Sequence, residues 1–179
     1  SNNKDYELAE KIDTEIGILA YNLGDFSRLV NATSYVDAVV VKEFINGNHT
    51  AESLPFYDIN ELIQQLILLS RVQIYTNNAE VLKVLYYAKE LVDSHRCLRN
   101  GNYVTSEVAS NLYNELAIIE DNPQRSIEYY KKSLDITDKF DYGTSLNLAF
   151  EYINVGNFAE ADSLFNDVYL YSKDQYMEP

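Results

Sequence analysis

Residues 148–168 have the sequence LAFEYINVGNFAEADSLFNDV, and this stretch decides the fold. Apolar and aromatic side chains recur at spacings of three and four on both sides of Gly156, which is the pattern of two amphipathic helices. A glycine readily adopts the left-handed backbone conformation that commonly ends a helix. Each half also contains a small residue, Ala149 or Ala161, that would let the two helices approach closely. The stretch therefore predicts a helical hairpin with its corner at Gly156.

The same frame recurs along the chain. It consists of a small residue, a corner glycine seven positions later and an aromatic residue two beyond that, and near the start of the chain these are Gly17, Gly24 and Phe26. Two weaker copies lie between the first and the last, so the four copies occupy approximately residues 10–43, 65–98, 107–140 and 142–175. Such a period indicates a repeat architecture, in which each hairpin covers the apolar face of its neighbour.

The arrangement resembles the tetratricopeptide repeat, whose pattern is Leu-Gly-x2-Tyr, a turn and then Ala-x3-Phe. The last copy matches it at Leu148-Ala149, Tyr152 and Ala161, but it lacks the leading tryptophan. The resemblance implies an all-α fold, a right-handed α-α superhelix of about eight or nine helices, in a single domain over residues 1–179. Aromatic residues at repeat positions are expected to fill the space between hairpins, namely Tyr75, Tyr130, Tyr152, Phe158 and Phe165.

The composition agrees with an all-α protein. Six glycines and three prolines among 179 residues indicate few turns and therefore few strands. Strand-like alternation occurs only at residues 38–41, and we assign that run to a helix because it continues a longer helical pattern. The formal net charge of −14 argues against nucleic acid and against an anionic membrane surface as partners. No apolar stretch is long enough to insert in a membrane.

Recognised catalytic and cofactor motifs are absent. The sequence has no phosphate-binding loop, no dinucleotide fingerprint and no nucleophile elbow. His95 and Cys97 are two residues apart, and such residues point in different directions on a helix. A lone cysteine also excludes an internal disulfide and a multi-cysteine metal site. We therefore predict a protein that is not an enzyme and that needs no metal or cofactor.

Three asparagines fall near the end of the first helix in three copies: Asn22, Asn77 and Asn154. The resemblance implies that first helices line the concave face of the array. A side-chain amide has both a donor and an acceptor, so a row of amides there would hold the backbone of an extended peptide. The alternative is local, because asparagine tolerates the left-handed conformation found at helix ends.

Apolar residues and further asparagines on the first helices complete the predicted binding surface. The predicted ligand-binding set is Asn22, Asn77, Asn154, Ile18, Tyr21, Phe150, Ile153, Asn111 and Asn147. The same frame also places six further residues on the concave face, namely Lys11, Thr14, Leu69, Gln73, Glu115 and Ile118. We expect a protein or peptide to bind in this groove, with the apolar residues as side-chain anchors.

The predicted function is a non-enzymatic binding module, the sensor or interaction domain of a larger bacterial regulator in the cytoplasm or periplasm. The chain begins at Ser1 without a methionine and shows no clear capping helix after its last copy, so we expect it to be a fragment. Two alternatives stay open: a free-standing adaptor and a glycan-binding accessory lipoprotein. The uncapped C-terminal end would also allow self-association.

Overall fold

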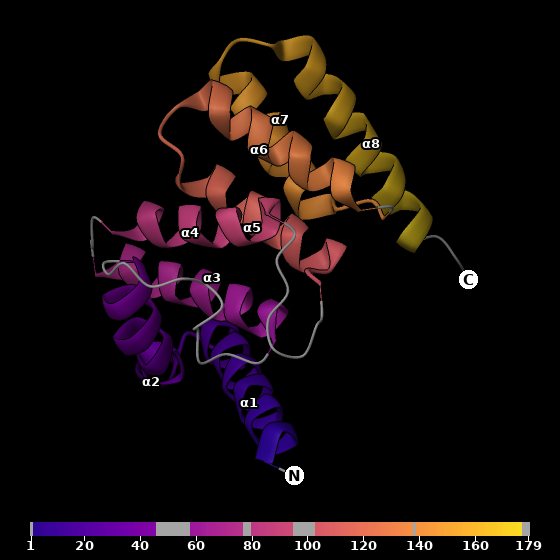
Figure 1. The fold of residues 1–179 in the computed structure, drawn as a ribbon. Helices are drawn as coiled ribbons and strands as arrows, with labels where there is room; N and C mark the ends of the chain where they lie inside the picture. Colours follow the sequence, from indigo (N-terminus) through magenta and orange to yellow (C-terminus); the bar gives the residue numbers. More distant parts are fainter. Residues whose placement is uncertain (1, 46–57, 77–79, 95–102, 138, 177–179) are drawn as a thin grey trace. The chain divides into compact units, whose positions relative to one another are not determined.

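The computed structural model describes residues 2–45, 58–76, 80–94, 103–137 and 139–176 (Figure 1). In these ranges the chain forms eight α-helices and one π-helix, and it contains no β-strand. Each helix packs against neighbours along the chain, which is the arrangement of a helical-repeat protein. The all-α prediction is confirmed, while the right-handed superhelix stays a prediction.

The chain divides into two compact units, residues 1–108 and 109–179. The first unit contains α1 (Asn2–Asn22), α2 (Phe26–Val36), the π-helix η1 (Asp37–Ile45), α3 (Ile59–Tyr75) and α4 (Val81–Asp93). The second unit begins within α5 (Ser106–Ile119) and continues with α6 (Pro123–Ile136), α7 (Tyr142–Asn154) and α8 (Phe158–Tyr176). None of the described helices is both long and apolar enough to cross a membrane.

Helix η1 continues α2 directly, so the valine run at residues 38–41 is helical as predicted. The wider π-helical turn brings Val40 and Val41 into the core one after the other, and both are buried together with Val36. These residues belong to the segment that contacts α2 and α4. Tertiary packing therefore outweighs the strand preference of the β-branched residues.

Both predicted corners are left-handed glycines, with φ of 67° at Gly24 and 81° at Gly156. In each corner the glycine N–H donates to the carbonyl oxygen three residues earlier, at 3.1 and 3.0 Å. The N–H of the following residue donates to the carbonyl oxygen five residues earlier, at 2.8 Å in both. This is the Schellman arrangement, which satisfies the last carbonyl groups of a helix. Two hairpins of the chain thus turn by the same backbone mechanism.

We predict that Gly156→Ala lowers the free energy of unfolding by about 1 kcal/mol, since a Cβ disfavours the left-handed conformation. No heavy atom lies within 4 Å of the added Cβ, so the loss reflects backbone conformation and not a clash. Gly156→Asn should cost less, because asparagine tolerates this conformation better. Urea denaturation measures both variants. An alanine variant as stable as the parent would contradict a left-handed corner.

In the first unit, α1 packs against both α2 and α3. Gly17 marks the closest approach, because a Cβ built there would lie 2.7 Å from Leu68 Cδ1 and 3.6 Å from Ala32 Cβ. The adjacent core contains Ala20, Leu29, Leu68 and Val72, with Ile18 packed against it. Glycine at position 17 therefore sets how closely three helices meet.

A second prediction concerns this contact. Gly17→Val should lower the free energy of unfolding by about 1–3 kcal/mol, because the extra atoms overfill a packed core. The matched control is Gly143→Val on the exposed first turn of α7, where a Cβ meets only Asp141 Oδ1 at 3.6 Å. The control should change stability by less than about 0.5 kcal/mol. Equal effects of the two variants in urea denaturation would refute the close approach.

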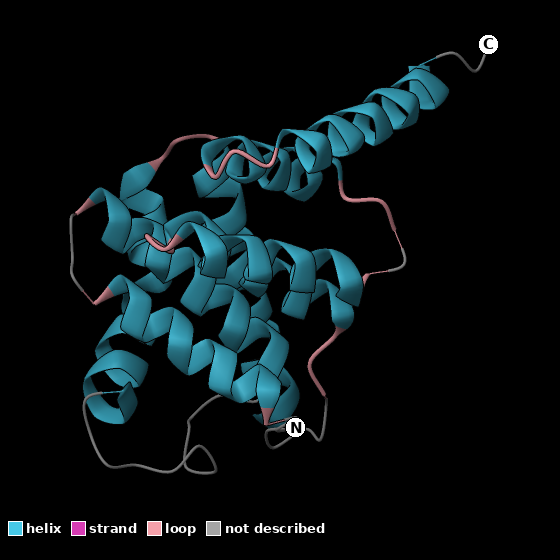
Figure 2. Cartoon of the chain, turned by 90° about the horizontal axis from the view of Figure 1, so that it is seen from above, coloured by secondary structure: helices cyan, strands magenta, loops and turns pink. Residues whose placement is uncertain are grey.

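In the second unit, serines occupy close-contact positions between α5 and α6. The Ser110 and Ser133 hydroxyls each lie within hydrogen-bond distance of the other residue's backbone carbonyl, at 3.0 and 2.9 Å. The Ser126 hydroxyl donates to the Ala117 carbonyl at 2.8 Å. Small side chains thus bring the two helices together and bond across their interface. Figure 2 shows the C-terminal part of α8 extending beyond the other helices of its unit.

The expected roles of the aromatic residues hold only in part. Tyr130 and Tyr152 are buried in the core of the second unit, and Phe165 packs partly buried against them, as predicted. The prediction is wrong for Phe158 and Tyr75, which are 67% and 69% exposed. Each lies at an end of its hairpin, where too few neighbouring side chains surround the ring to bury it.

Candidate functional site

The clearest site is a pocket of about 380 Å³ in the first unit. Three chain segments meet there: the end of α1 with its corner, the start of α2 and the end of α3. The lining residues are Ala20, Tyr21, Gly24, Phe26, Leu29, Tyr75 and Thr76. Ala20 and Leu29 are buried and form the floor, whereas three aromatic residues form partly exposed walls. The volume is within the usual range for small ligand sites.

The pocket coincides with a difference between two hairpins. Ala20 and Tyr152 both lie four residues before a left-handed corner glycine. The Tyr152 ring is buried in the core of its own hairpin. Alanine at the equivalent place leaves free the volume that such a ring would fill. A small residue at position 20 therefore opens the pocket.

The walls of the pocket are held by aromatic contacts. Phe26 and Tyr75 pack edge to face with their ring centroids 5.6 Å apart. The Arg71 guanidinium lies 4.2 Å from the centroid of the Tyr21 ring, within the range of a cation–π interaction. The Thr76 hydroxyl lies 3.2 Å from the backbone carbonyls of both Val72 and Gln73, to which it can donate. The lining combines apolar surface with a few hydroxyl groups at the rim.

This lining suits binding better than chemistry. No carboxylate, imidazole or thiol belongs to it, so none of its side chains is a usual general base near neutral pH. An apolar floor with aromatic walls can instead enclose an aliphatic or aromatic group. Each tyrosine hydroxyl can donate or accept one hydrogen bond with a polar part of the ligand.

Within the first unit, the predicted residues take different places. Tyr21 lines the pocket. Ile18 is only partly exposed and packs against the core beside the pocket. Asn22, the last residue of α1, is exposed one position beyond Tyr21. The structure thus places these three predicted residues on the final turn and a half of one helix.

In the second unit, the predicted residues of α7 form one exposed surface. Phe150, Ile153 and Asn154 are exposed, and Asn147 is partly exposed one turn earlier. The Phe150 ring also packs edge to face on Phe165 of α8, with centroids 5.7 Å apart. This contact fixes its orientation while more than half of the side chain faces solvent. The remaining predicted residue, Asn111, is exposed on α5.

The structure bears on the two explanations for the asparagines. Asn22 and Asn154 each lie two residues before a left-handed glycine, inside their helices. The left-handed position is therefore taken by glycine, and asparagine is not needed for it. Within the described part of the chain, neither side-chain amide has a hydrogen-bond partner. Asn77 lies outside the described residues, so the row of three stays a prediction.

Four other residues expected on the concave face are buried instead: Thr14, Leu69, Gln73 and Glu115. Thr14 lies between α1 and α3, where the Gln65 amide donates to its hydroxyl at 3.4 Å and to the Glu10 carbonyl at 3.3 Å. The helical frame alone did not reveal this contact, because it joins residues about fifty positions apart.

Two buried acceptor atoms in α3 have no hydrogen-bond partner among the described residues: Glu61 Oε2 and Gln73 Oε1.

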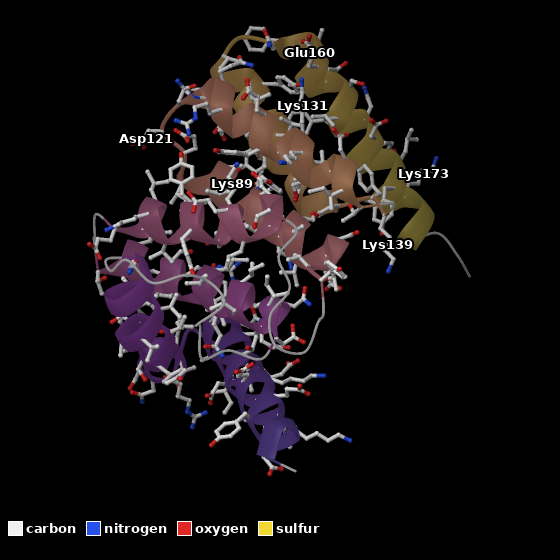
Figure 3. All side chains as sticks on the ribbon, viewed as in Figure 1. Lys89, Asp121, Lys131, Lys139, Glu160 and Lys173 are labelled. Atoms are coloured by element: carbon white, nitrogen blue, oxygen red, sulfur yellow. The ribbon has the colours of Figure 1, made fainter. Side chains whose placement is uncertain are left out.

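A strongly perturbed titration belongs to Tyr130 in the second unit. Burial, followed by the nearby carboxylates of Glu151 and Glu115, raises the pKa of the Tyr130 phenol to about 12. A hydrogen bond with Tyr152 is the main cause that raises the pKa of Lys131, and Glu160 adds to it. Figure 3 labels Lys131 on α6 and Glu160 on α8. Tyr130 lies in the core of the unit, and Lys131 is exposed at its surface.

A third prediction follows for alkaline pH. An unfolded tyrosine ionises near pH 10, whereas folded Tyr130 keeps its proton up to about pH 12. Because the folded state then holds more protons, its stability must fall as pH rises from 10 to 12. Tyr130→Phe should remove part of this fall, while Tyr142→Phe at an exposed position should not. Urea denaturation across this pH range measures it, and parallel curves for all three proteins would contradict the shift.

Sequence reasoning missed most of the pocket. Tyr21 was predicted as a binding residue, but Tyr75 was assigned to packing between hairpins and Phe26 was named only as part of the repeat frame. The available signal was Ala20, which stands where the tetratricopeptide pattern has tyrosine. Thr76 carried no signal, because its part in the pocket depends on how α3 packs across the first hairpin.

Comparison with known proteins does not assign the chain to a family. No protein-family model matches the chain, and no curated protein matches its sequence. The described residues contain no group of three or more side chains that could hold a metal ion. His95 and Cys97, set aside above as a catalytic pair, lie outside the described residues.

Proposed function

We propose that the chain is a non-enzymatic protein- or peptide-binding module built of tetratricopeptide-like hairpins. The observation that carries the proposal is the aromatic pocket at the first corner. Its volume of about 380 Å³ can take a large apolar side chain with some of the neighbouring backbone. In this account the pocket holds one such side chain as the anchor of a peptide segment.

Asn22 can contact the part of the peptide that lies outside the pocket. It is exposed one residue beyond Tyr21, and its amide has no partner among the described residues. An amide there can donate to and accept from a peptide backbone next to the anchor. The anchor would give affinity, and the amide would hold the segment without regard to its sequence.

We further propose that the module is the sensor or interaction domain of a larger bacterial regulator, as the sequence led us to expect. A free-standing adaptor and a glycan-binding lipoprotein are the rival functions. Peptide selection separates the glycan-binding function from the other two, because a sugar site would not enrich peptides with a common apolar anchor.

The test begins with selection of short random peptides by phage display against the whole chain. We expect enriched peptides to share one aromatic or branched aliphatic residue. Fluorescence anisotropy then compares their binding to the parent protein, to Ala20→Phe and to Ala159→Phe. Ala20→Phe places a ring in the pocket and should weaken binding at least about tenfold. Ala159→Phe makes the same change at an exposed site on α8 and should leave binding unchanged.

A second variant tests the pocket in case Ala20→Phe fails to fold. Tyr75 is mostly exposed, so Tyr75→Ala should retain the fold, as circular dichroism would confirm, and still weaken binding. Peptides that bind the parent, Ala20→Phe and Tyr75→Ala equally well would show that the pocket is not the binding site. Failure to enrich any peptide, with binding to a defined oligosaccharide, would favour the glycan-binding function.

A further inference from the structure

The outer face of α1 carries a line of exposed aliphatic residues that the proposed pocket does not use. They follow one another at spacings of four, four, three and four, and are between 44% and 68% exposed: Leu8, Ile12, Ile16, Leu19 and Leu23. At this spacing the first four lie on one face of α1, and Leu23 continues the line in the turn directly after the last helical residue, Asn22. At 1.5 Å per residue the line is about 22 Å long. We call these five residues the α1 ridge.

The ridge is not part of the core of its unit. The buried residues of α1 are Thr14, Gly17 and Ala20, and they belong to the side that faces α2 and α3. The ridge lies on roughly the opposite side of the helix. Five aliphatic side chains in a continuous line form the kind of exposed patch that marks a protein interaction surface. Their spacing is that of a helix that packs against another helix along its length.

The charges beside the ridge indicate the chemistry of its partner. Helix α1 contains five carboxylates and two lysines. Both lysines, Lys4 and Lys11, lie along one side of the ridge, and the net charge of the helix is −3. Asp5 lies at the N-terminal end of the ridge, and Asp13 and Glu15 lie on its two sides, with Glu15 on the side of the lysines. All three are exposed, and none has an ion pair within the described part of the chain. Burial also raises the pKa of the Asp13 carboxyl, so a cationic partner group would offset a desolvation penalty already present.

We propose that the α1 ridge docks an amphipathic helix of another protein that carries lysine or arginine beside its own apolar line. Apolar side chains supply the contact area, and the flanking charges select the partner and its register. A second copy of this chain would bring together two α1 helices that each carry a net charge of −3. The same acids, in a chain of net charge −14, are repelled by an anionic membrane.

The test uses two designed helical peptides with leucines at the spacing of the ridge. One has lysines beside the leucines and the other has glutamates at the same places. Fluorescence anisotropy measures their binding to the whole chain at low and physiological salt. The ridge variant combines Ile16→Ser with Leu19→Ser. The matched control combines Ile118→Ser with Leu170→Ser, which are also exposed. A third protein, Asp13→Asn with Glu15→Gln, removes the flanking charges.

We expect the lysine peptide to bind at least about tenfold tighter than the glutamate peptide. The ridge variant should weaken this binding about tenfold or more, and the control should not. The charge variant should weaken it less and reduce its dependence on salt. Ala20→Phe should leave it unchanged, which separates this surface from the pocket.

Four outcomes would overturn the proposal. The first is that neither peptide binds or both bind equally. The second is binding that the ridge variant leaves intact although circular dichroism shows its fold retained. The third is a dimer of the parent, detected by sedimentation, that the ridge variant abolishes. The fourth is ridge-dependent binding to vesicles that contain phosphatidylserine.

Discussion

The first unit depends on the close contact at Gly17, where α1 meets α2 and α3 and where an added Cβ would require the Leu68 side chain to shift. The nearest atom to a Cβ there would be Leu68 Cδ1 at 2.7 Å. This contact brings the end of α3 across the corner between α1 and α2. The corner itself depends on a left-handed glycine, Gly24, whose backbone bonds close the end of α1. With both features in place, the pocket residues from three helices come together.

The pocket exists because the first hairpin has a small residue at a position where the last hairpin has a large one. The last hairpin fills its corner with the buried ring of Tyr152, whereas the first has Ala20 at the same offset. A filled corner gives stability through buried apolar area. An open corner gives up that area and leaves a cavity walled by Tyr21, Phe26 and Tyr75. The first hairpin thus has an open pocket, whereas the last hairpin buries an aromatic ring at the equivalent position.

Much of the fold could be predicted from the sequence because its determinants are local. A corner glycine is recognised by its position after an apolar helical run, and both Gly24 and Gly156 adopt the expected conformation. The helical period also identified the valine run of η1 correctly, against the strand preference of its residues. The all-α class follows from these local signals together with the scarcity of glycine and proline.

The site could be predicted only in part, because its geometry depends on contacts between distant segments. Tyr21, which lines the pocket, was among the predicted residues. The repeat frame could not show that the rings of Phe26 and Tyr75 pack with their centroids 5.6 Å apart to form a wall. For the same reason Thr14, expected on a binding face, is instead buried against Gln65 of α3. Local period gives the face of a residue on its helix, and tertiary packing decides what covers that face.

The most direct test of this account is a nuclear Overhauser spectrum of the protein with labelled leucine methyl groups and aromatic rings. The central claim is that α3 packs across the first hairpin and closes the pocket. The account predicts cross-peaks from a Leu68 methyl group to the Gly17 Hα protons and between the rings of Phe26 and Tyr75. If Leu68 shows cross-peaks only to residues of α3 and α4, α3 does not pack on the hairpin and the pocket does not exist.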